Sequence, residues 1–176
     1  MLIKSGRSNR NTLKSSGLAM ALLIGALGTS CGLVPEHPGD EGMLLGFRIT
    51  DRTVEVKAPL CPGDKVSRVE VWDPGSETAK EKMLWWGEGP TGAAADSGQL
   101  YLWSPAGYRK ASTALKPSAL PHLVDVSVSY ADQDDSAGDL VNLDEVAKHH
   151  PTDEYWTITG ESMSAQEING QLSCPQ

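Results

Sequence analysis

The feature that most constrains this fold is an alternation of apolar and polar side chains with a period of two, which recurs in short segments from residue 42 onward. It is clearest in residues 123–130, where Val124, Val126, Val128 and Tyr130 alternate with polar residues. Successive side chains of a β-strand point to opposite sides, so the pattern predicts a strand with one buried face. Six further segments have the same pattern or a β-rich composition: residues 45–49, 54–58, 66–73, 82–87, 99–104 and 155–159.

Turn residues separate these segments and favour an all-β fold. The 176-residue chain contains 18 glycines and 11 prolines, and its length suits a single domain. Two capping-box patterns, residues 142–145 and 164–167, predict helices of only one or two turns, the second ending at Gly170. We therefore expect an antiparallel β-sandwich, immunoglobulin-like in general plan, with about seven strands and one or two short helices. A small open barrel is the alternative, because periodicity does not distinguish the two.

The N-terminal segment predicts export. Residues 1–17 are polar and basic, residues 18–27 form an uncharged apolar run, and Gly28, Thr29 and Ser30 lead directly into Cys31. This arrangement resembles the lipobox of bacterial lipoproteins, although that family most often has Leu three residues before the cysteine, where this chain has Gly28. The resemblance implies that a diacylglycerol is attached to Cys31 and that the chain is cut before it.

Two other interpretations of this segment remain open. An uncleaved transmembrane helix would need roughly 20 apolar residues, more than the strongly apolar part provides. An ordinary cleaved signal would leave a soluble product, but no A-x-A site directly follows the apolar run. We expect a signal peptide over residues 1–30, the lipidated cysteine with a proline-containing tether over residues 31–41, and one domain over residues 42–176. The protein would then be held by lipid at the extracytoplasmic face of a cell membrane.

The remaining cysteines fit an oxidising compartment. Cys61 and Cys174 are too far apart in sequence for C-x-x-C redox chemistry, and we expect them to form a disulfide. Two unpaired buried thiols are the alternative, because spacing does not establish connectivity.

The charge of the chain argues against nucleic-acid binding. The net charge of −8 becomes −12 after cleavage before Cys31, because four basic residues and no acidic ones precede that cysteine. Such a surface repels phosphate backbones, and no basic patch reverses its sign locally.

Tryptophan is the most frequent aromatic residue, and one adjacent pair is informative. Trp85 and Trp86 lie on a predicted strand and must point to opposite faces. Core packing explains most tryptophans, but the outward member of this pair is a candidate for a surface that binds a glycan or a partner protein.

Candidate metal ligands occur at two places. Residues 132–145 contain six carboxylates, an oxygen-rich composition that can hold calcium, but neither alignment to the EF-hand loop places both the turn glycine and the final glutamate correctly. A solvated acidic loop is the favoured interpretation. His149 and His150 lie near Asp153 and Glu154, but adjacent histidines rarely converge on a metal without a third ligand. We expect no bound metal or other cofactor.

The domain also resembles small lipoproteins of actinobacteria. The likeness rests on the predicted hairpin of residues 45–58, the turn of residues 61–64, the Val-Glu-Val-Trp sequence of residues 69–72 and the Trp85–Trp86 pair. Those proteins have no settled activity, so the likeness implies no function.

The sequence has neither of two specific motifs of known chemistry. There is no H-E-x-x-H zinc-protease motif and no Walker phosphate-binding sequence. We expect a non-catalytic protein that binds an envelope component or a partner protein. The alternatives are a calcium-stabilised adhesion or sensor domain, and an envelope hydrolase whose paired carboxylates have no sequence signature.

Overall fold

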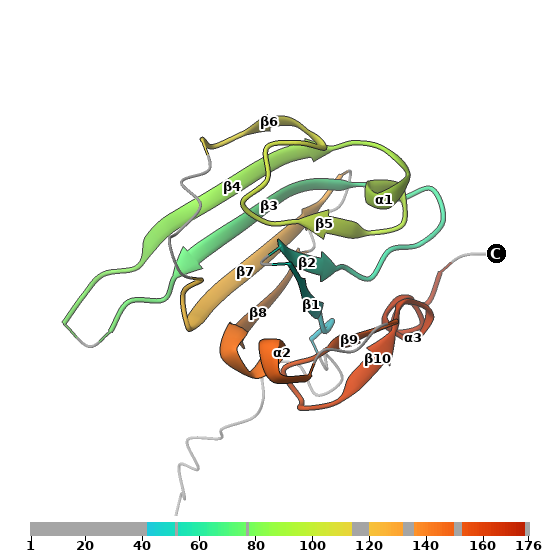
Figure 1. The fold of residues 1–176 in the computed structure, drawn as a ribbon. Coiled ribbons are helices and arrows are strands. Elements are labelled where there is room, and N and C mark those ends of the chain that lie inside the picture. The colour runs from blue at the N-terminus through green and yellow to red at the C-terminus, as the bar shows by residue number, and fades with distance from the viewer. Residues whose placement is uncertain are drawn as a thin grey trace, which may run out of the picture. The chain divides into compact units, whose positions relative to one another are not determined.

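The computed structural model describes residues 42–51, 53–76, 78–113, 120–131, 136–149 and 153–174, which lie in one compact unit, Gly39–Gln176. This unit is built from two antiparallel five-stranded sheets (Figure 1). Sheet A has the order β10-β9-β1-β2-β5, with β1 Gly46–Thr50, β2 Thr53–Lys57, β5 Gln99–Tyr101, β9 Glu154–Trp156 and β10 Ser162–Ser164. Sheet B has the order β6-β4-β3-β7-β8, with β3 Val66–Asp73, β4 Lys82–Pro90, β6 Tyr108–Ala111, β7 Leu123–Tyr130 and β8 Ser136–Asn142.

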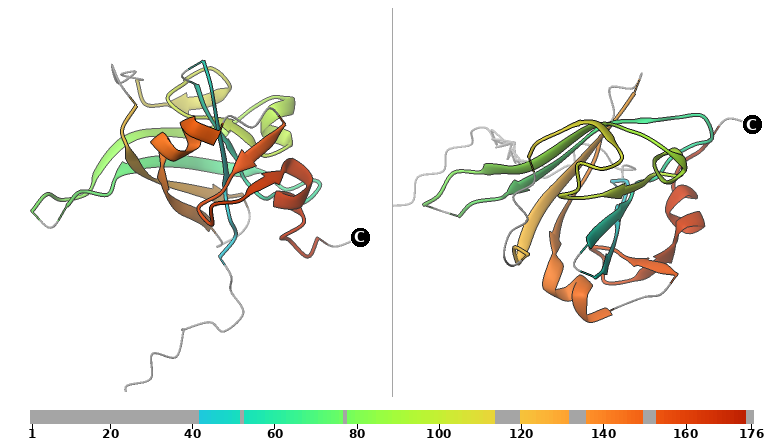
Figure 2. Two further views of the ribbon diagram at one scale, coloured as in Figure 1. Left: turned by 60° about the horizontal axis from the view of Figure 1, so that its bottom comes forward. Right: turned by 45° about the horizontal axis from the view of Figure 1, so that its top comes forward.

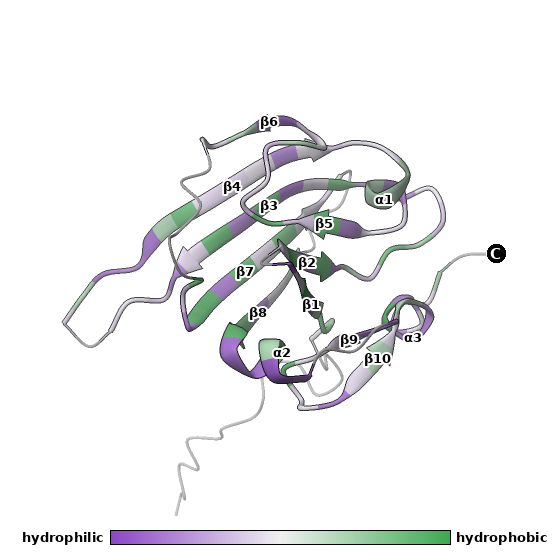
Figure 3. Ribbon diagram, in the orientation of Figure 1, coloured by the Kyte–Doolittle hydropathy of each residue, from purple (hydrophilic) through white to green (hydrophobic). Residues whose placement is uncertain are grey.

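The predicted antiparallel sandwich is confirmed, and the two separate sheets replace the alternative of one barrel. In Figure 2 the β1–β2 hairpin of sheet A, drawn in teal, lies over one face of sheet B. The inner faces of both sheets contribute to a single core. Phe47 and Val56 face it from sheet A, and Val69, Val126 and Trp85 face it from sheet B, each at most 1% exposed. The alternation that predicts these strands is visible as green and purple bands along β3 and β7 in Figure 3.

All seven predicted strand segments contain strands, but the described residues form ten. The additional strands are β6, β8 and β10. The sequence of β8, Ser-Ala-Gly-Asp-Leu-Val-Asn, alternates correctly, but its inward positions include Asp139 between Ala137 and Val141. This strand pairs with residues 123–129 of β7, and its inward Asp139 accepts from the amide of Leu45, 94 residues away. That distant contact is not encoded in the composition of the strand itself.

Among the residues that the structure describes, three short helices join the strands, one more than the upper limit expected. They are α1 Ala93–Asp96, α2 Leu143–His149 and α3 Ala165–Asn169. The Ser164–Glu167 capping box at α3 is confirmed in both of its hydrogen bonds, and Gly170 is the C-cap. At α2, Asn142 Oδ1 accepts from the amides of Asp144 and Glu145.

Helix α3 lies on the outer face of sheet A, opposite to the main core. Ile168 of α3 is fully buried and lies so close to Gly46 that a Cβ atom there would be 2.4 Å from Ile168 Cδ1 and 2.5 Å from Tyr155 Cβ. Glycine at position 46 therefore allows the helix to approach the sheet. The described residues include no helix long and apolar enough to cross a membrane.

Candidate functional site

Strand β4 directs its two adjacent tryptophans to opposite sides of sheet B, as expected from strand geometry. Trp85 is 1% exposed and belongs to the core. Trp85 is therefore the inward member of the pair and is not available to a binding surface, so Trp86 is the remaining candidate. Trp86 is half-buried on the outer face, where it pairs across the strands with Glu70.

Local packing explains why Trp85 is the inward member. Its ring meets the ring of Tyr108 edge to face, with 5.3 Å between centroids and 76° between planes. The space beside both rings is available because position 87 is glycine, where a Cβ atom would lie 2.6 Å from Tyr108 and 2.7 Å from Trp85. This arrangement fixes the side of the sheet on which Trp86 must lie.

A second tryptophan and a charged pair accompany Trp86 on the outer face. The Arg68 guanidinium lies over the Trp86 ring, 5.0 Å from its centroid, and Arg68 Nε donates to Glu70 Oε1 at 2.5 Å. The other carboxylate oxygen of Glu70 accepts from the indole nitrogen of Trp72 at 3.1 Å. We call these four residues, Arg68, Glu70, Trp72 and Trp86, the indole surface. Each is held by at least one of the others, so the four side chains are pre-ordered.

The neighbouring strands surround the indole surface with small and polar residues. On β7, Ser127 and Ser129 pair with Glu70 and Arg68, and Gly138 of β8 follows Ser127 in the same row. On the other side, Glu88 lies between Arg68, at 4.0 Å, and Lys110, at 3.8 Å. The result is a sheet face with two indoles and with hydrogen-bond donors and acceptors close to them.

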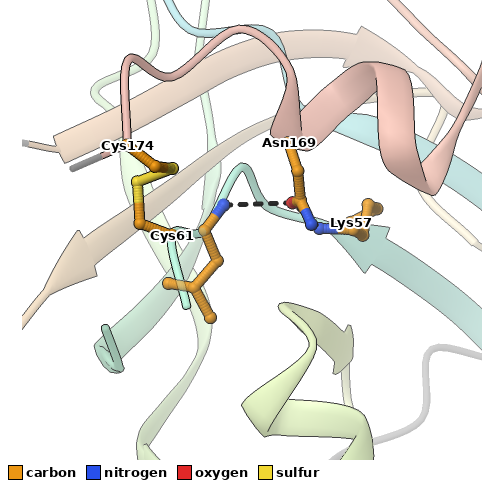
Figure 4. The surroundings of a disulfide bond; sticks show 5 residues. Lys57, Cys61, Asn169 and Cys174 are labelled. Carbon is orange, nitrogen blue, oxygen red and sulfur yellow. Dashed lines mark hydrogen bonds between the residues drawn. A yellow bond between two sulfur atoms is a disulfide. The ribbon is translucent and has the colours of Figure 1, made fainter. Parts of the chain in front are cut away.

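The predicted cysteine pair is present in the structure. Cys61 and Cys174 form a disulfide across 113 residues of sequence, which connects the segment after β2 to the segment after α3 (Figure 4). Asn169, the last residue of α3, adds a noncovalent link between the same segments, because its Oδ1 accepts from the amide of Leu60 at 3.1 Å. Cys31, the predicted lipidation site, lies outside the described residues.

The carboxylates considered for calcium do not gather in the described part of the chain. Asp139 is buried in β8, where it accepts from the amide of Leu45 at 2.6 Å. Asp144 contacts His122, and Glu145 pairs with Lys148 at 2.7 Å. Residues 132–135 lie outside the described ranges.

Of the two adjacent histidines considered as metal ligands, only His149 lies within the described residues. Its ring stacks on Trp156, with 3.7 Å between centroids and 11° between planes. Its Nδ1 lies 2.8 Å from the carbonyl oxygen of Glu145. Across the residues with described positions, no group of three or more His, Cys, Asp or Glu side chains could hold a metal ion.

Sequence reasoning missed a polar cluster on the outer face of sheet A. The Glu55 carboxylate accepts from Arg48 at 2.8 and 2.9 Å and from the Tyr155 hydroxyl at 2.5 Å, and Gln99 donates to the same hydroxyl at 2.9 Å. Burial, followed by the hydrogen bond to Glu55, raises the pKa of Tyr155 to about 12. Arg48 and Glu55 are opposite each other in the predicted hairpin, a signal for the ion pair. Nothing in the sequence near Glu55 predicts its hydrogen bond with Tyr155, which is 100 residues away.

Comparison of the chain with protein-family models, with curated proteins and with solved structures gives no match.

Proposed function

We propose that this protein is a lipid-anchored, extracytoplasmic binding protein that recognises a glycan of the cell envelope through the indole surface, without catalysing a reaction. The observation that carries this proposal is the position of Trp72 and Trp86 on one face of sheet B, where Trp72 contacts Glu70 and Trp86 contacts Arg68 of one ion pair.

A carbohydrate chain suits this arrangement of side chains. The face of an indole ring is electron-rich and attracts the weakly positive C–H bonds on the flat side of a sugar ring. Arg68 and Glu70 offer donors and acceptors to the hydroxyl groups at the rim of that ring. The ordered contacts among the four residues lower the entropy cost of binding, because little rotamer freedom remains to be lost.

The anchoring part of the proposal rests on the N-terminal sequence. The apolar run of residues 18–27 and the small residues before Cys31 resemble a lipobox, and the disulfide fits an oxidising compartment outside the cytoplasm. Two acyl chains on one cysteine give lasting membrane attachment, whereas a single chain binds only marginally.

The test is co-sedimentation of the purified protein with insoluble envelope polysaccharide from the native host, stripped of protein. We expect wild type to sediment and Trp86→Ala and Trp72→Ala to lose most of the bound fraction, at least tenfold in affinity. Ile158→Ala is the matched control, because Ile158 is an exposed apolar residue, 48% accessible, close to the end of β9 in sheet A.

Two outcomes would contradict the glycan proposal. Equal sedimentation of all four proteins would show that the indole surface does not bind the polysaccharide. If polysaccharide bound none of them, while Trp86→Ala abolished a crosslink to a protein in intact envelopes, the ligand would be a protein partner.

A further inference from the structure

Lys57 is a buried lysine with an unusual environment. It is the last residue of β2, its side chain is 1% exposed, and it lies on the outer face of sheet A. Its Nζ donates to the backbone carbonyl of Ala58 at 2.6 Å and to the side-chain carbonyl of Asn169. Figure 4 shows the end of the Lys57 side chain directly against the side-chain amide of Asn169.

Neither of these two partners of Lys57 has a formal charge. Burying an ammonium group favours its neutral form unless a carboxylate compensates, and burial lowers the pKa of Lys57 to about 8. Near neutral pH, Lys57 is therefore an uncharged amine in part of the molecules, and this is the nucleophilic form of lysine.

The amide of Asn169 is polarised at the same place. Its Oδ1 accepts from Lys57 Nζ and also from the backbone amide of Leu60 at 3.1 Å. During attack, Lys57 Nζ must turn its lone pair towards Cγ, so the Leu60 amide is the donor that remains on Oδ1. This amide withdraws electron density from Cγ and stabilises the negative charge on the oxygen, as a donor of an oxyanion hole does. Because the fold holds amine and amide in contact, the reaction is effectively unimolecular.

We propose that Lys57 and Asn169 become joined by an intramolecular isopeptide bond. The lone pair of neutral Nζ attacks Cγ of Asn169, and the negative charge develops on Oδ1 beside the Leu60 amide. The C–N bond to Nδ2 then breaks, a proton from Nζ passes to the departing nitrogen, and one molecule of ammonia leaves. No oxidant, reductant or other co-reactant is consumed.

The surroundings of Asn169 provide a route for the ammonia. Asn169 lines an open cavity of about 290 Å³ together with Leu60, Asp96 and the two disulfide cysteines. The Asp96 carboxylate in this cavity accepts hydrogen bonds from a departing ammonia or ammonium.

The bond would give the C-terminal segment a second covalent attachment, independent of redox conditions. Lys57 and Asn169 are 112 residues apart and join the same two segments as the Cys61–Cys174 disulfide. Reducing the disulfide would then leave α3 attached to β2.

The test is mass spectrometry of the full chain after reduction and unfolding, followed by protease digestion. We expect a branched peptide in which the segment containing Lys57 is linked to the segment containing Asn169, with the mass of one ammonia missing. Recovery of both segments only as separate linear peptides would overturn the proposal.

A matched comparison excludes another source of ammonia loss. Asn169 precedes Gly170, and an Asn-Gly pair can lose ammonia by closing on its own backbone as a succinimide. Lys57→Met should restore the missing mass if the isopeptide forms, and Lys65→Met should leave the loss unchanged. If the loss persists in Lys57→Met, a succinimide accounts for it and the isopeptide is excluded.

Discussion

At the scale of single residues, Asp139 makes the folding free energy depend on pH. The pKa of this carboxyl is raised from 3.8 to about 6, mainly by burial. The hydrogen bond from the Leu45 amide lowers the pKa by a smaller amount, and the nearby charge of Asp125 raises it further. The folded protein therefore holds this proton more tightly than the unfolded chain, and the resulting stability is complete below pH 4 and is lost as the pH rises through 6.

The prediction is that Asp139→Asn removes this dependence. The asparagine side-chain oxygen still accepts from Leu45, but no charge has to be buried. Relative to wild type, we expect the variant to gain about 1–3 kcal/mol in unfolding free energy between pH 4 and pH 7. Urea unfolding across that range measures the difference, and a difference that does not change with pH would contradict the assignment.

Gly46 is the residue that sets the distance between sheet A and α3. In Gly46→Ala the new methyl group would overlap Ile168 and Tyr155, so we expect a loss of about 1–3 kcal/mol in unfolding free energy. Gly42→Ala is the control, because no atom lies within 4 Å of a Cβ built there. Equal stability of the two variants, measured by chemical denaturation, would mean that α3 is not packed against the sheet.

At the scale of elements, α3 is stabilised at both ends. It has five residues, too few to be stable alone, and depends on the Ser164 capping box before it and the disulfide after it. We predict that Ser164→Ala costs about 1 kcal/mol, because the Glu167 amide loses its acceptor. The matched control is Ser162→Ala in β10, outside the cap. Thermal unfolding measures both, and an unchanged midpoint in Ser164→Ala would show that the cap does not stabilise the domain.

The same elements show which features the sequence predicts. The hairpin, the strand of residues 123–130 and the α3 capping box depend on neighbouring residues, and all three were predicted correctly. Strand β8 was missed because its inward Asp139 breaks the apolar pattern, and the partner of this carboxylate is the amide of Leu45, 94 residues away. The orientation of the tryptophan pair was also undecided, because it depends on the packing of Tyr108 against Trp85 beside Gly87. Contacts distant in sequence decided each case.

At the scale of the whole molecule, the described fold and the proposed anchor involve different parts of the chain. Within the described part of the chain, the buried core begins at Leu45. The indole surface lies on β3 and β4, and the disulfide joins two segments of the same unit. Attachment and folding can therefore be tested separately.

The corresponding prediction is that Cys31→Ala releases the protein from the membrane while the fold persists. Without the thiol there is no attachment point for the two acyl chains, each of whose buried methylenes contributes about 0.8 kcal/mol. The acidic domain has no compensating attraction to anionic headgroups. Fractionation of native cells with detergent partitioning measures the release, and circular dichroism of the purified variant measures the fold. Retention of the variant in the membrane, with residues 1–30 still attached, would instead indicate an uncleaved N-terminal helix.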